Sequence, residues 1–538
     1  MSDHVTLPSR RSVLHGAGVL AAVGALGLPA AAAAPRPDGG GPFRHGVASG
    51  DPLPDGVLLW TRVTPTDDAL PGSGVGPDVT LDWEVAQDSR FRKVVARGRA
   101  ATGAWRDHTV SVDVTGLAPA TTYWYRFRLG RQASPVGRTR TAPAVGAGAA
   151  GLRMGVLSCA NWQAGHFAAY RHLAARDDLD VVLHLGDYLY EYAPGEYQAG
   201  DVVVRPHEPA REMTTLADYR QRHAQYKTDP DLQALHAAAP WVVTWDDHES
   251  ANDAHRDGAE NHTEGAEGTW WQRQAFSQQA YAEWMPVRYR AGGRLYRSLA
   301  FGSLMSLSML DLRTYRELGT SITGAAQMSW LLDRLSDRSA QWKVVGNPVM
   351  ITPVRFPSTL STQELQALHE LTGTPPVDGA PYNTDQWDGY TDDRAIVLRH
   401  LRDNGIRDTT FLTGDIHSAW ACDIPVDPLT YPSTGDSVAT ELVGTSVTSD
   451  NVDDILGVPP RTASLAVEAA VRANNPHIKH LELDSHGYSV VEVTPARLQM
   501  DWYALSDRTD PQATSTHVAS YEVAAGTQKV RPAGEALR

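Results

Sequence analysis

The sequence predicts a mixed α+β and α/β protein, in which an N-terminal β-sandwich is followed by a larger domain of alternating strands and helices. Residues 43–142 contain short runs of alternating polar and apolar residues separated by turn residues, a pattern typical of antiparallel sandwiches. From residue 151 onward, continuous apolar runs alternate with helical stretches. Such runs indicate strands that are buried on both faces of a sheet.

In the predicted sandwich, strands are expected over 56–63, 79–85 and 109–114. Residues 117–127 resemble a strand pair of the fibronectin type III kind, so the domain is expected to be fibronectin-like. Stretches rich in proline, glycine and alanine flank it and are interpreted as linkers over 35–42 and 143–150.

The larger domain is predicted to span residues 151–510, with 511–538 as a C-terminal tail. Ligands of such α/β sheets bind at the carboxyl ends of the strands, so the residues that follow each strand are the first candidates for a site. Strands are expected over 152–158, 181–185, 241–245, 304–310, 342–350, 409–413, 488–493 and 498–503, and helices over 167–176, 269–283 and 326–335.

Residues 1–34 have the pattern of an export signal. Arg10 and Arg11 precede a weakly apolar run and then a series of alanines, with a cleavage site expected near Ala33. The paired arginines resemble a twin-arginine signal, which implies the twin-arginine export machinery and a secreted or cell-wall-associated product. The alternative is a membrane anchor, but the run is too short to span a hydrocarbon core of about 30 Å.

Composition narrows the possible functions of the 538-residue chain. The formal charge of -15 argues against a general nucleic-acid binder, because such proteins need a basic surface. Two cysteines, Cys159 and Cys422, exclude a disulfide scaffold and allow one bridge at most. No segment after the signal has 18 unbroken apolar residues, so no stable membrane anchor is expected.

Four predicted strands each end in residues of the types that bind metals. Each short motif alone is weak, because a Gly-Asp pair after a strand usually forms only a turn. Four of them in order predict one crevice where carboxylate, imidazole and thiolate side chains converge. The four segments are Ser158–Trp162, Gly186–Tyr190, Trp245–Glu249 and Gly414–His417.

The residue types in this set suit two different cations. Asp187 can bridge two cations, because a carboxylate has two oxygens with several lone pairs. Cys159 and Tyr190 are anionic when they bind a metal, which favours ferric iron over magnesium. Two adjacent cations would clamp a phosphoryl group and convert a bound water into hydroxide.

These motifs resemble those of the metallophosphoesterases, with a departure at each step. Cys159 stands in the first motif, Tyr190 replaces the second aspartate, and Asp247-His248-Glu249 replaces Asn-His-Glu. Asp415-Ile416-His417 replaces His-x-His. Together the departures resemble the PhoD-type alkaline phosphatases, and the calcium-stimulated phospholipase D of actinomycetes has the same pattern. The resemblance runs from about Phe43 to about Tyr503 and implies a four-layer α/β/β/α catalytic domain.

The resemblance also implies roles for particular residues, with Fe³⁺ and one or two Ca²⁺ as cofactors. Iron would be held by four residues, of which Asp187 bridges to calcium; further aspartates would hold calcium, with Asp246 or Asn252 as additional ligands. His248 would protonate the leaving group or bind a phosphoryl oxygen. Asn347, in the slot where relatives place a histidine, is a weaker candidate for binding the substrate. The iron ligands are Cys159, Asp187, Tyr190 and His417; the calcium ligands include Asp187, Asp247 and Asp415; Trp387 and Tyr390 are candidate walls of the substrate site.

The sequence thus predicts a secreted, monomeric, metal-dependent hydrolase of phosphate esters that acts by direct attack of a metal-bound hydroxide or oxide. One alternative is a phospholipase D that uses the same metal site, and another is a non-catalytic secreted metal-binding protein. A serine hydrolase is not supported, because Gly444-Thr445-Ser446-Val447 lacks the second glycine of a nucleophile elbow. A Cys159–Cys422 disulfide would compete directly with the iron site.

Overall fold

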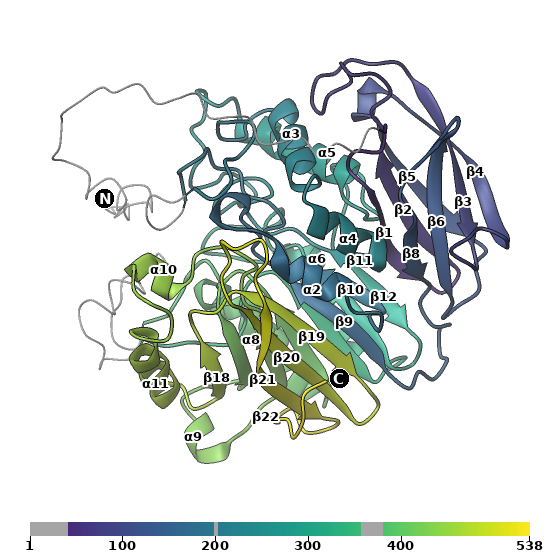
Figure 1. Ribbon diagram of the computed structural model, residues 1–538. Coiled ribbons are helices and arrows are strands. Elements are labelled where there is room, and N and C mark those ends of the chain that lie inside the picture. Colours follow the sequence, from purple (N-terminus) through teal and green to yellow (C-terminus); the bar gives the residue numbers. More distant parts are fainter. Residues whose placement is uncertain (1–40, 198–202, 357–368, 370–379, 538) are drawn as a thin grey trace, which may run out of the picture.

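The computed structural model describes residues 41–197, 203–356, 369 and 380–537 (Figure 1). The predicted signal peptide and most of the 35–42 linker lie outside the described residues. The described part is a mixed α/β structure with three sheets. Among its helices, none has the length and apolar character needed to cross a bilayer.

The largest sheet has ten strands and joins three parts of the chain. Its centre is parallel, with β9, β10 and β11 side by side, and the C-terminal strands extend one edge while N-terminal strands extend the other. In order, the strands are β22 (Val530–Pro532), β21 (Ser515–Ala524), β20 (Arg497–Leu505), β19 (Gly487–Val493), β9 (Leu152–Leu157), β10 (Val181–His184), β11 (Trp241–Val243), β1 (Val47–Leu53), β2 (Gly56–Arg62) and β5 (Thr109–Thr115).

A seven-stranded sheet packs against the ten-stranded one across an apolar core that both sheets supply, for example through Leu183 and Leu307. Its apolar runs read as continuous because both of its faces are covered. Its strands, in order, are β12 (Arg297–Phe301), β13 (Met305–Met309), β14 (Trp342–Asn347), β15 (Thr409–Thr413), β17 (Ala439–Val443), β16 (Ala419–Ile424) and β18 (Ile478–Glu482).

Helices cover the outer faces of these two sheets. One apolar cluster joins the first four helices to the ten-stranded sheet, and another joins α6 and α8 to the seven-stranded sheet. The helices are α2 (Ala168–Ala174), α3 (Leu216–Tyr226), α4 (Pro230–Ala238), α5 (Trp270–Trp284), α6 (Gly324–Ser336), α8 (Thr391–Asp403), α9 (Tyr431–Thr434), α10 (Val452–Leu456) and α11 (Ser464–Asn474).

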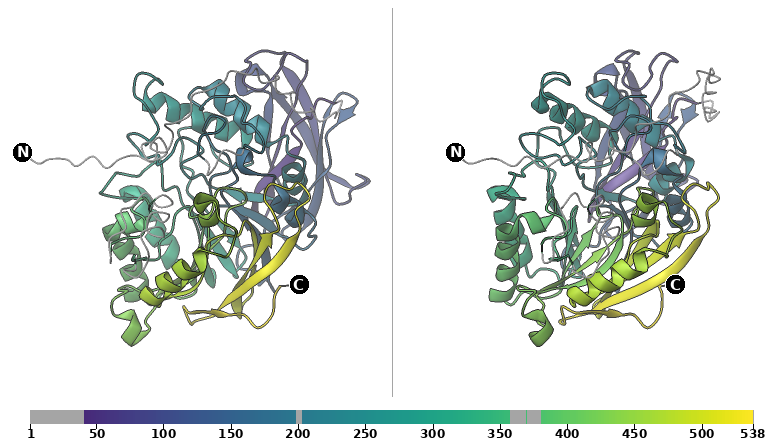
Figure 2. Two further views of the ribbon diagram at one scale, coloured as in Figure 1. Left: turned by 60° about the vertical axis from the view of Figure 1, so that its left-hand side comes forward. Right: turned by 90° about the vertical axis from the view of Figure 1, so that its left-hand side faces the viewer.

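The N-terminal strands form a β-sandwich whose core includes Leu59, Val85 and Tyr125. One of its two sheets consists of β1, β2 and β5, and the other of β4 (Val94–Thr102), β3 (Val79–Ala86), β6 (Thr122–Leu129), β7 (Gln132–Ala133) and β8 (Gly137–Arg140). In both views of Figure 2 these purple strands lie above the yellow C-terminal strands.

The sandwich is joined to the rest of the fold, because β1 pairs in parallel with β11 and makes one of its sheets continuous with the central sheet. Most predicted strands and helices are confirmed to within one or two residues, but two expectations are wrong. Residues 117–127 contribute a single strand, β6, after a turn in which Ala118 N donates to Tyr123 Oη at 2.9 Å. Residues 511–538 are not a tail, since β21 pairs with β20 along its whole length.

Candidate metal centre

The four predicted ligand segments follow the carboxyl ends of strands that meet where the two large sheets face each other. Three of these strands, β9, β10 and β11, are neighbours in the ten-stranded sheet, and β15 belongs to the seven-stranded sheet. Two glycines allow the close approach. A Cβ atom at Gly186 would lie 2.6 Å from Cβ of Asp246, and one at Gly414 would lie 2.8 Å from Cβ of Ser158. The glycine of each Gly-Asp pair is therefore required by space.

The backbone at the strand ends adopts an uncommon conformation. Positive φ angles are rare for residues other than glycine, and they cluster where the surrounding structure holds side chains in functional positions. Four predicted ligands have them: φ is 57° at Cys159, 52° at Asp187, 66° at Asp415 and 50° at His417. All four residues lie just beyond the carboxyl ends of β9, β10 and β15.

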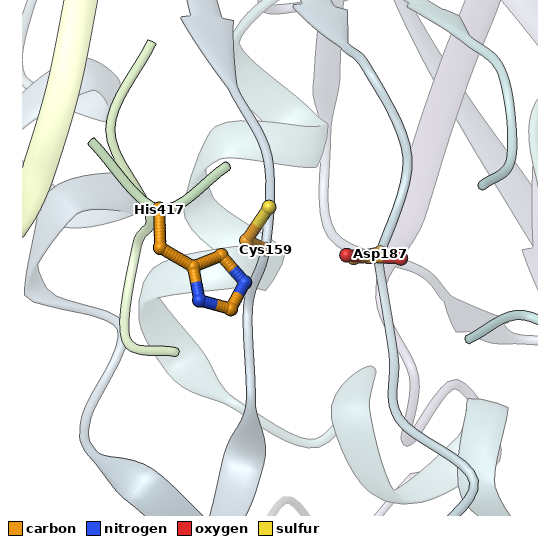
Figure 3. Close-up of side chains that lie close together, drawn as sticks. All are labelled: Cys159, Asp187 and His417. Carbon is orange, nitrogen blue, oxygen red and sulfur yellow. The ribbon is translucent and has the colours of Figure 1, made fainter. Parts of the chain in front are cut away.

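Asp187 is at the centre of the site. It belongs to three groups of side chains whose ligand atoms lie within 4.8 Å of one another. The first group, shown in Figure 3, brings Cys159, Asp187 and His417 together from three separate segments. The other two groups join Asp187 to Asp247 and His248, and to Asp246 and Asp415.

Tyr190 completes the first group. Its hydroxyl oxygen lies 3.2 Å from Asp187 Oδ2 and 3.4 Å from His417 Nε2. The side chain is fully buried, and its ring stacks near the imidazole of His248, with ring centres 4.2 Å apart. The structure thus places thiol, carboxylate, phenol and imidazole around one point, which is the donor set expected for the iron site.

The electrostatics of this group of ligands favour the binding of positive charge. Burial and the neighbouring carboxylates outweigh the opposing effect of His248 and raise the pKa of Asp187 well above its ordinary value, and burial and Asp246 raise the pKa of Asp415 to about 8. Burial and Asp187 raise the pKa values of Cys159 and Tyr190. Asp187 Oδ1 is buried and has no hydrogen-bond partner. Buried carboxylates are normally paired or bind a metal, so these residues fit cations.

Comparison with known proteins agrees with this geometry. The sequence matches the family described as PhoD-like phosphatase over residues 154–502, and the N-terminal domain of PhoD-like phosphatases over residues 29–143. The chain belongs to the PhoD-like phosphatase family. It is 36% identical to alkaline phosphatase D of Bacillus subtilis (strain 168), in an alignment that covers 95% of this chain and 87% of the relative.

A solved structure described as the structure of PhoD has a TM-score of 0.81 and 34% sequence identity to the chain. The match covers 92% of this chain and 93% of that one. The resemblance found in the motifs is therefore confirmed, and the chain is a metal-dependent phosphoester hydrolase.

Around the PhoD-like centre, the predicted calcium ligands differ in what surrounds them. Arg313 donates to both oxygens of Asp246, at 2.6 and 3.1 Å, so the guanidinium already supplies that carboxylate with positive charge. Asp247 Oδ2 accepts from the backbone of Asp253 at 2.7 Å. Asn252 Oδ1 is buried without a hydrogen-bond partner, which leaves it available to a cation. Asn252 thus offers a free acceptor atom, whereas Asp246, which is grouped with Asp187 and Asp415, is already paired with Arg313.

Sequence reasoning missed Glu191. This fully buried carboxylate accepts hydrogen bonds from the backbone of Asn252 at 2.7 Å and from Asn261 Nδ2 at 2.8 Å, and it lies 2.8 Å from His248 Nδ1. Burial lowers the pKa of His248, but Asp247, Glu191 and the nearby Asp187 outweigh that effect and raise it well above its ordinary value. In the sequence, the position of Glu191 directly after the proposed ligand Tyr190 could have indicated this role.

Glu249 and Gln386 were also missed. Glu249 accepts hydrogen bonds from the backbone N–H groups of Asp187 at 3.1 Å, Tyr188 at 2.7 Å and Asp246 at 2.9 Å, which ties two of the ligand turns together. Gln386 Nε2 donates to Asp415 Oδ2 at 2.8 Å. Both side chains therefore hold proposed ligand residues in position through hydrogen bonds.

Two of the predicted substrate residues serve the fold instead. The Asn347 side chain is fully buried; its Nδ2 donates to Thr413 Oγ1 at 3.1 Å, and its Oδ1 accepts from Trp387 Nε1 at 3.2 Å. Trp387 is fully buried as well. Neither presents a free polar group to a phosphate. Tyr390 is buried beside Arg316, whose guanidinium lies 5.6 Å from the ring centre.

The structure also excludes the competing disulfide. Cys159 and Cys422 are both free and both buried. Cys422 lies in β16, where burial and Glu441 raise the pKa of its thiol. Of the two thiols, Cys159 is the one that is grouped with other ligand types among the described residues.

Proposed function

We propose that this PhoD-like phosphatase is an exported enzyme that uses one Fe³⁺ and one or two Ca²⁺ to hydrolyse phosphate esters of alcohols. The observation that carries the proposal is the position of Asp187, whose carboxylate is shared by a thiol–imidazole group and by two oxygen-rich groups within 4.8 Å. A shared carboxylate between two unlike donor sets suits two unlike cations.

In this proposal Cys159, Asp187, Tyr190 and His417 hold iron, and Asp187, Asp247, Asp415 and Asn252 hold calcium. Bound there, the cations would neutralise the phosphoryl oxygens and lower the pKa of water. The chain itself orients the ligands: the backbone of Asp450 accepts from His417 Nδ1 at 2.9 Å, which directs Nε2 toward Tyr190 and Asp187. No serine, threonine or aspartate is placed by a motif as a covalent nucleophile.

His248 is proposed to hold the proton that the leaving alkoxide needs. Its Nδ1 faces Glu191 at 2.8 Å, so Nε2 remains for the substrate, and the carboxylates nearby favour the protonated ring. Proton transfer of this kind contributes roughly 10²–10⁴-fold to a rate. Tyr190 packs on one side of the ring and limits its orientation.

Alkaline phosphatase or broad phosphodiesterase activity is the main proposal, and phospholipase D activity is the second. The first is supported by 36% identity to an alkaline phosphatase D over nearly the whole chain. The test is turnover of p-nitrophenyl phosphate, bis-p-nitrophenyl phosphate and phosphatidylcholine by the purified protein. Hydrolysis of the first two is expected, and turnover of phosphatidylcholine alone would contradict the main proposal.

A non-catalytic metal-binding protein, the other alternative from the sequence, would bind metal without turnover of any of the three esters, and the 36% identity to an alkaline phosphatase D argues against it. We also propose export by the twin-arginine route and a monomeric product. Protein collected outside the cell should begin after about Ala33, and sedimentation should give one chain per particle. Elemental analysis of that exported protein should find iron and calcium together.

A further inference from the structure

One loop contacts three of the four proposed iron ligands without binding iron itself. Residues 446–451, here called the support loop, connect β17 to α10. Ser449 Oγ lies 2.6 Å from the hydroxyl oxygen of Tyr190 and 3.0 Å from the carbonyl oxygen of Cys159. The backbone N–H of Ser449 donates to the same carbonyl at 3.3 Å. The support loop therefore fixes both the turn that carries the thiol and the direction of the phenol.

The same loop orients the imidazole. The carbonyl oxygen of Asp450 lies 2.9 Å from His417 Nδ1. A histidine that donates one ring nitrogen to a carbonyl has its tautomer and ring plane fixed, which leaves the other nitrogen for a metal. A displacement of the support loop would thus change the position of His417, Tyr190 and Cys159 at once.

The support loop is held from its far side by Arg508, in the connection between β20 and β21. Its guanidinium pairs with Asp450 at 2.6 Å and with Asp454 at 3.0 Å, and it donates to the carbonyl of Thr448 at 2.6 Å. The side chain is 12% exposed, so these contacts are largely shielded from water and salt. One side chain thereby contacts two residues of the support loop and one residue of α10.

His486 joins the support loop to α10. His486 Nδ1 lies 3.0 Å from Ser446 Oγ, and its Nε2 lies 2.9 Å from Asp454 Oδ2. The order serine, histidine, aspartate resembles a hydrolase triad. However, Ser446 is fully buried, and its hydroxyl also lies 2.7 Å from the Ser449 carbonyl and 2.9 Å from Asn451 Oδ1. The three residues therefore brace the loop instead of offering a nucleophile.

From these contacts we infer that Arg508 is a positioning residue for the iron site. It acts through the support loop: the ion pair with Asp450 holds the carbonyl that orients His417, and the bond to Thr448 holds the residue before Ser449. The inference rests on the proposed iron ligands. Partners of metal ligands commonly change metal affinity by 10–100-fold when they are removed, and we expect a change of that size.

The test compares Arg508→Gln with Arg531→Gln in the full-length exported protein. Arg531 belongs to the same C-terminal region but is 64% exposed and pairs with Glu522, so its loss should change nothing. Four properties are measured for each variant: the iron content, the rate of iron release to a chelator, the temperature of unfolding, and the visible charge-transfer band that phenolate and thiolate ligands give with ferric iron. Arg508→Gln is expected to fold, to release iron roughly 10–100-fold faster and to shift the band.

The inference is overturned if Arg508→Gln releases iron at the wild-type rate with an unchanged band. If that variant fails to fold, Ser449→Ala tests the same support nearer the ligands, and an unshifted band there would overturn it equally. Wild-type protein without iron would refute the proposed iron site itself, a result distinct from an unaffected Arg508→Gln variant. A merely structural role for Arg508 would lower the unfolding temperature without moving the band.

Discussion

Asp51 and Asp187 are two buried aspartates of the ten-stranded sheet that obtain positive charge in different ways. Asp51 lies in β1 and Asp187 follows β10; they are 2% and 1% exposed, and both have positive φ angles, 44° and 52°. Arg297 binds both oxygens of Asp51, with its Nη2 2.6 Å from Oδ1. Within the described residues, Asp187 has no ion pair with lysine or arginine, and its Oδ1 has no hydrogen-bond partner.

The difference separates a structural carboxylate from a functional one. An ion is stable in a protein interior only when an opposite charge and hydrogen bonds compensate for lost water. The chain supplies that charge at Asp51, whereas at Asp187 burial and the neighbouring carboxylates outweigh the opposing effect of His248. Cations from outside would balance the ionised carboxylates, so Asp187 fits a metal site and Asp51 does not.

The largest effect is expected where the chain offers no charge of its own. Cys159→Ala removes an anionic donor next to Asp187, and we expect loss of nearly all iron and of phosphatase activity while the sandwich still folds. Cys422→Ala is the matched control, because that thiol is equally buried but belongs to none of the ligand groups found among the described residues. Elemental analysis and circular dichroism check both variants, and retained iron in Cys159→Ala would refute its role.

The second prediction removes the cation that the chain does supply. Arg297→Met leaves Asp51 buried without its ion pair, although the backbone N–H of Arg288 still donates to Oδ2, and we expect a loss of about 3–5 kcal/mol of unfolding free energy. Iron and calcium content should not change in the folded fraction. Arg402→Met, which removes an exposed pair with Asp403, is the control and should cost at most about 1 kcal/mol. Chemical denaturation measures the unfolding free energy of both variants. Equal losses would show that the buried Asp51 pair contributes no more to stability than an exposed pair.

A third prediction concerns pH in the metal-free protein. The pKa of Asp415 is raised to about 8 by burial and by Asp246, far above its value in an unfolded chain. A carboxyl with a raised pKa keeps its proton in the folded state only, so stability is present at low pH and is lost as pH rises toward 8. A tenfold difference in proton affinity between the folded and unfolded chain corresponds to about 1.4 kcal/mol of stability.

Chelated protein should therefore lose thermal stability between about pH 4 and pH 8, and the loss should be smaller in metal-loaded protein, where cations balance the carboxylates. Melting temperatures of both forms across this range are the measurement. Parallel curves for the two forms would mean that the acidic cluster does not limit stability. Stability that increased with pH in the chelated form would contradict the assigned direction of the pKa change.

A feature of this arrangement was predictable from the sequence when residues close together along the chain determine it. The strands over 152–157 and 409–413 were predictable because burial on both faces leaves a local apolar run. Two of the ligand turns were predictable because the pairs Gly186-Asp187 and Gly414-Asp415 directly follow apolar runs of this kind. The partnership of Glu191 with His248 was not, since the two residues are 57 positions apart and a lone glutamate carries no local pattern.

The same reasoning explains what was missed at both ends of the chain. The alternating runs predict a sandwich over 43–142 but not that its strand β1 will pair with β11, because the edge to which a strand adds is decided by tertiary packing. The long strand β21 was missed because Ser515–Ala524 is largely half-exposed and has no apolar run. The pairing of Arg313 with Asp246 could not be predicted either, because 67 positions separate the two residues.

The smallest effect should come from the carboxylate that acts only through another residue. Glu191→Gln keeps the shape and the hydrogen bonds to the Asn252 backbone but removes the charge beside His248 Nδ1. Without the negative charge of Glu191, the pKa of His248 falls, so the protonated ring is lost at lower pH and the alkaline limb of the kcat profile moves to lower pH.

His248→Ala should reduce kcat by roughly 10²–10⁴-fold and most for poor leaving groups, and Glu191→Gln should reduce kcat by roughly 10–100-fold with the same trend. Steady-state kinetics on a series of aryl and alkyl phosphates distinguish the two roles, because an equal loss for every leaving group would mean that His248 binds the phosphoryl oxygen and that Glu191 only orients it.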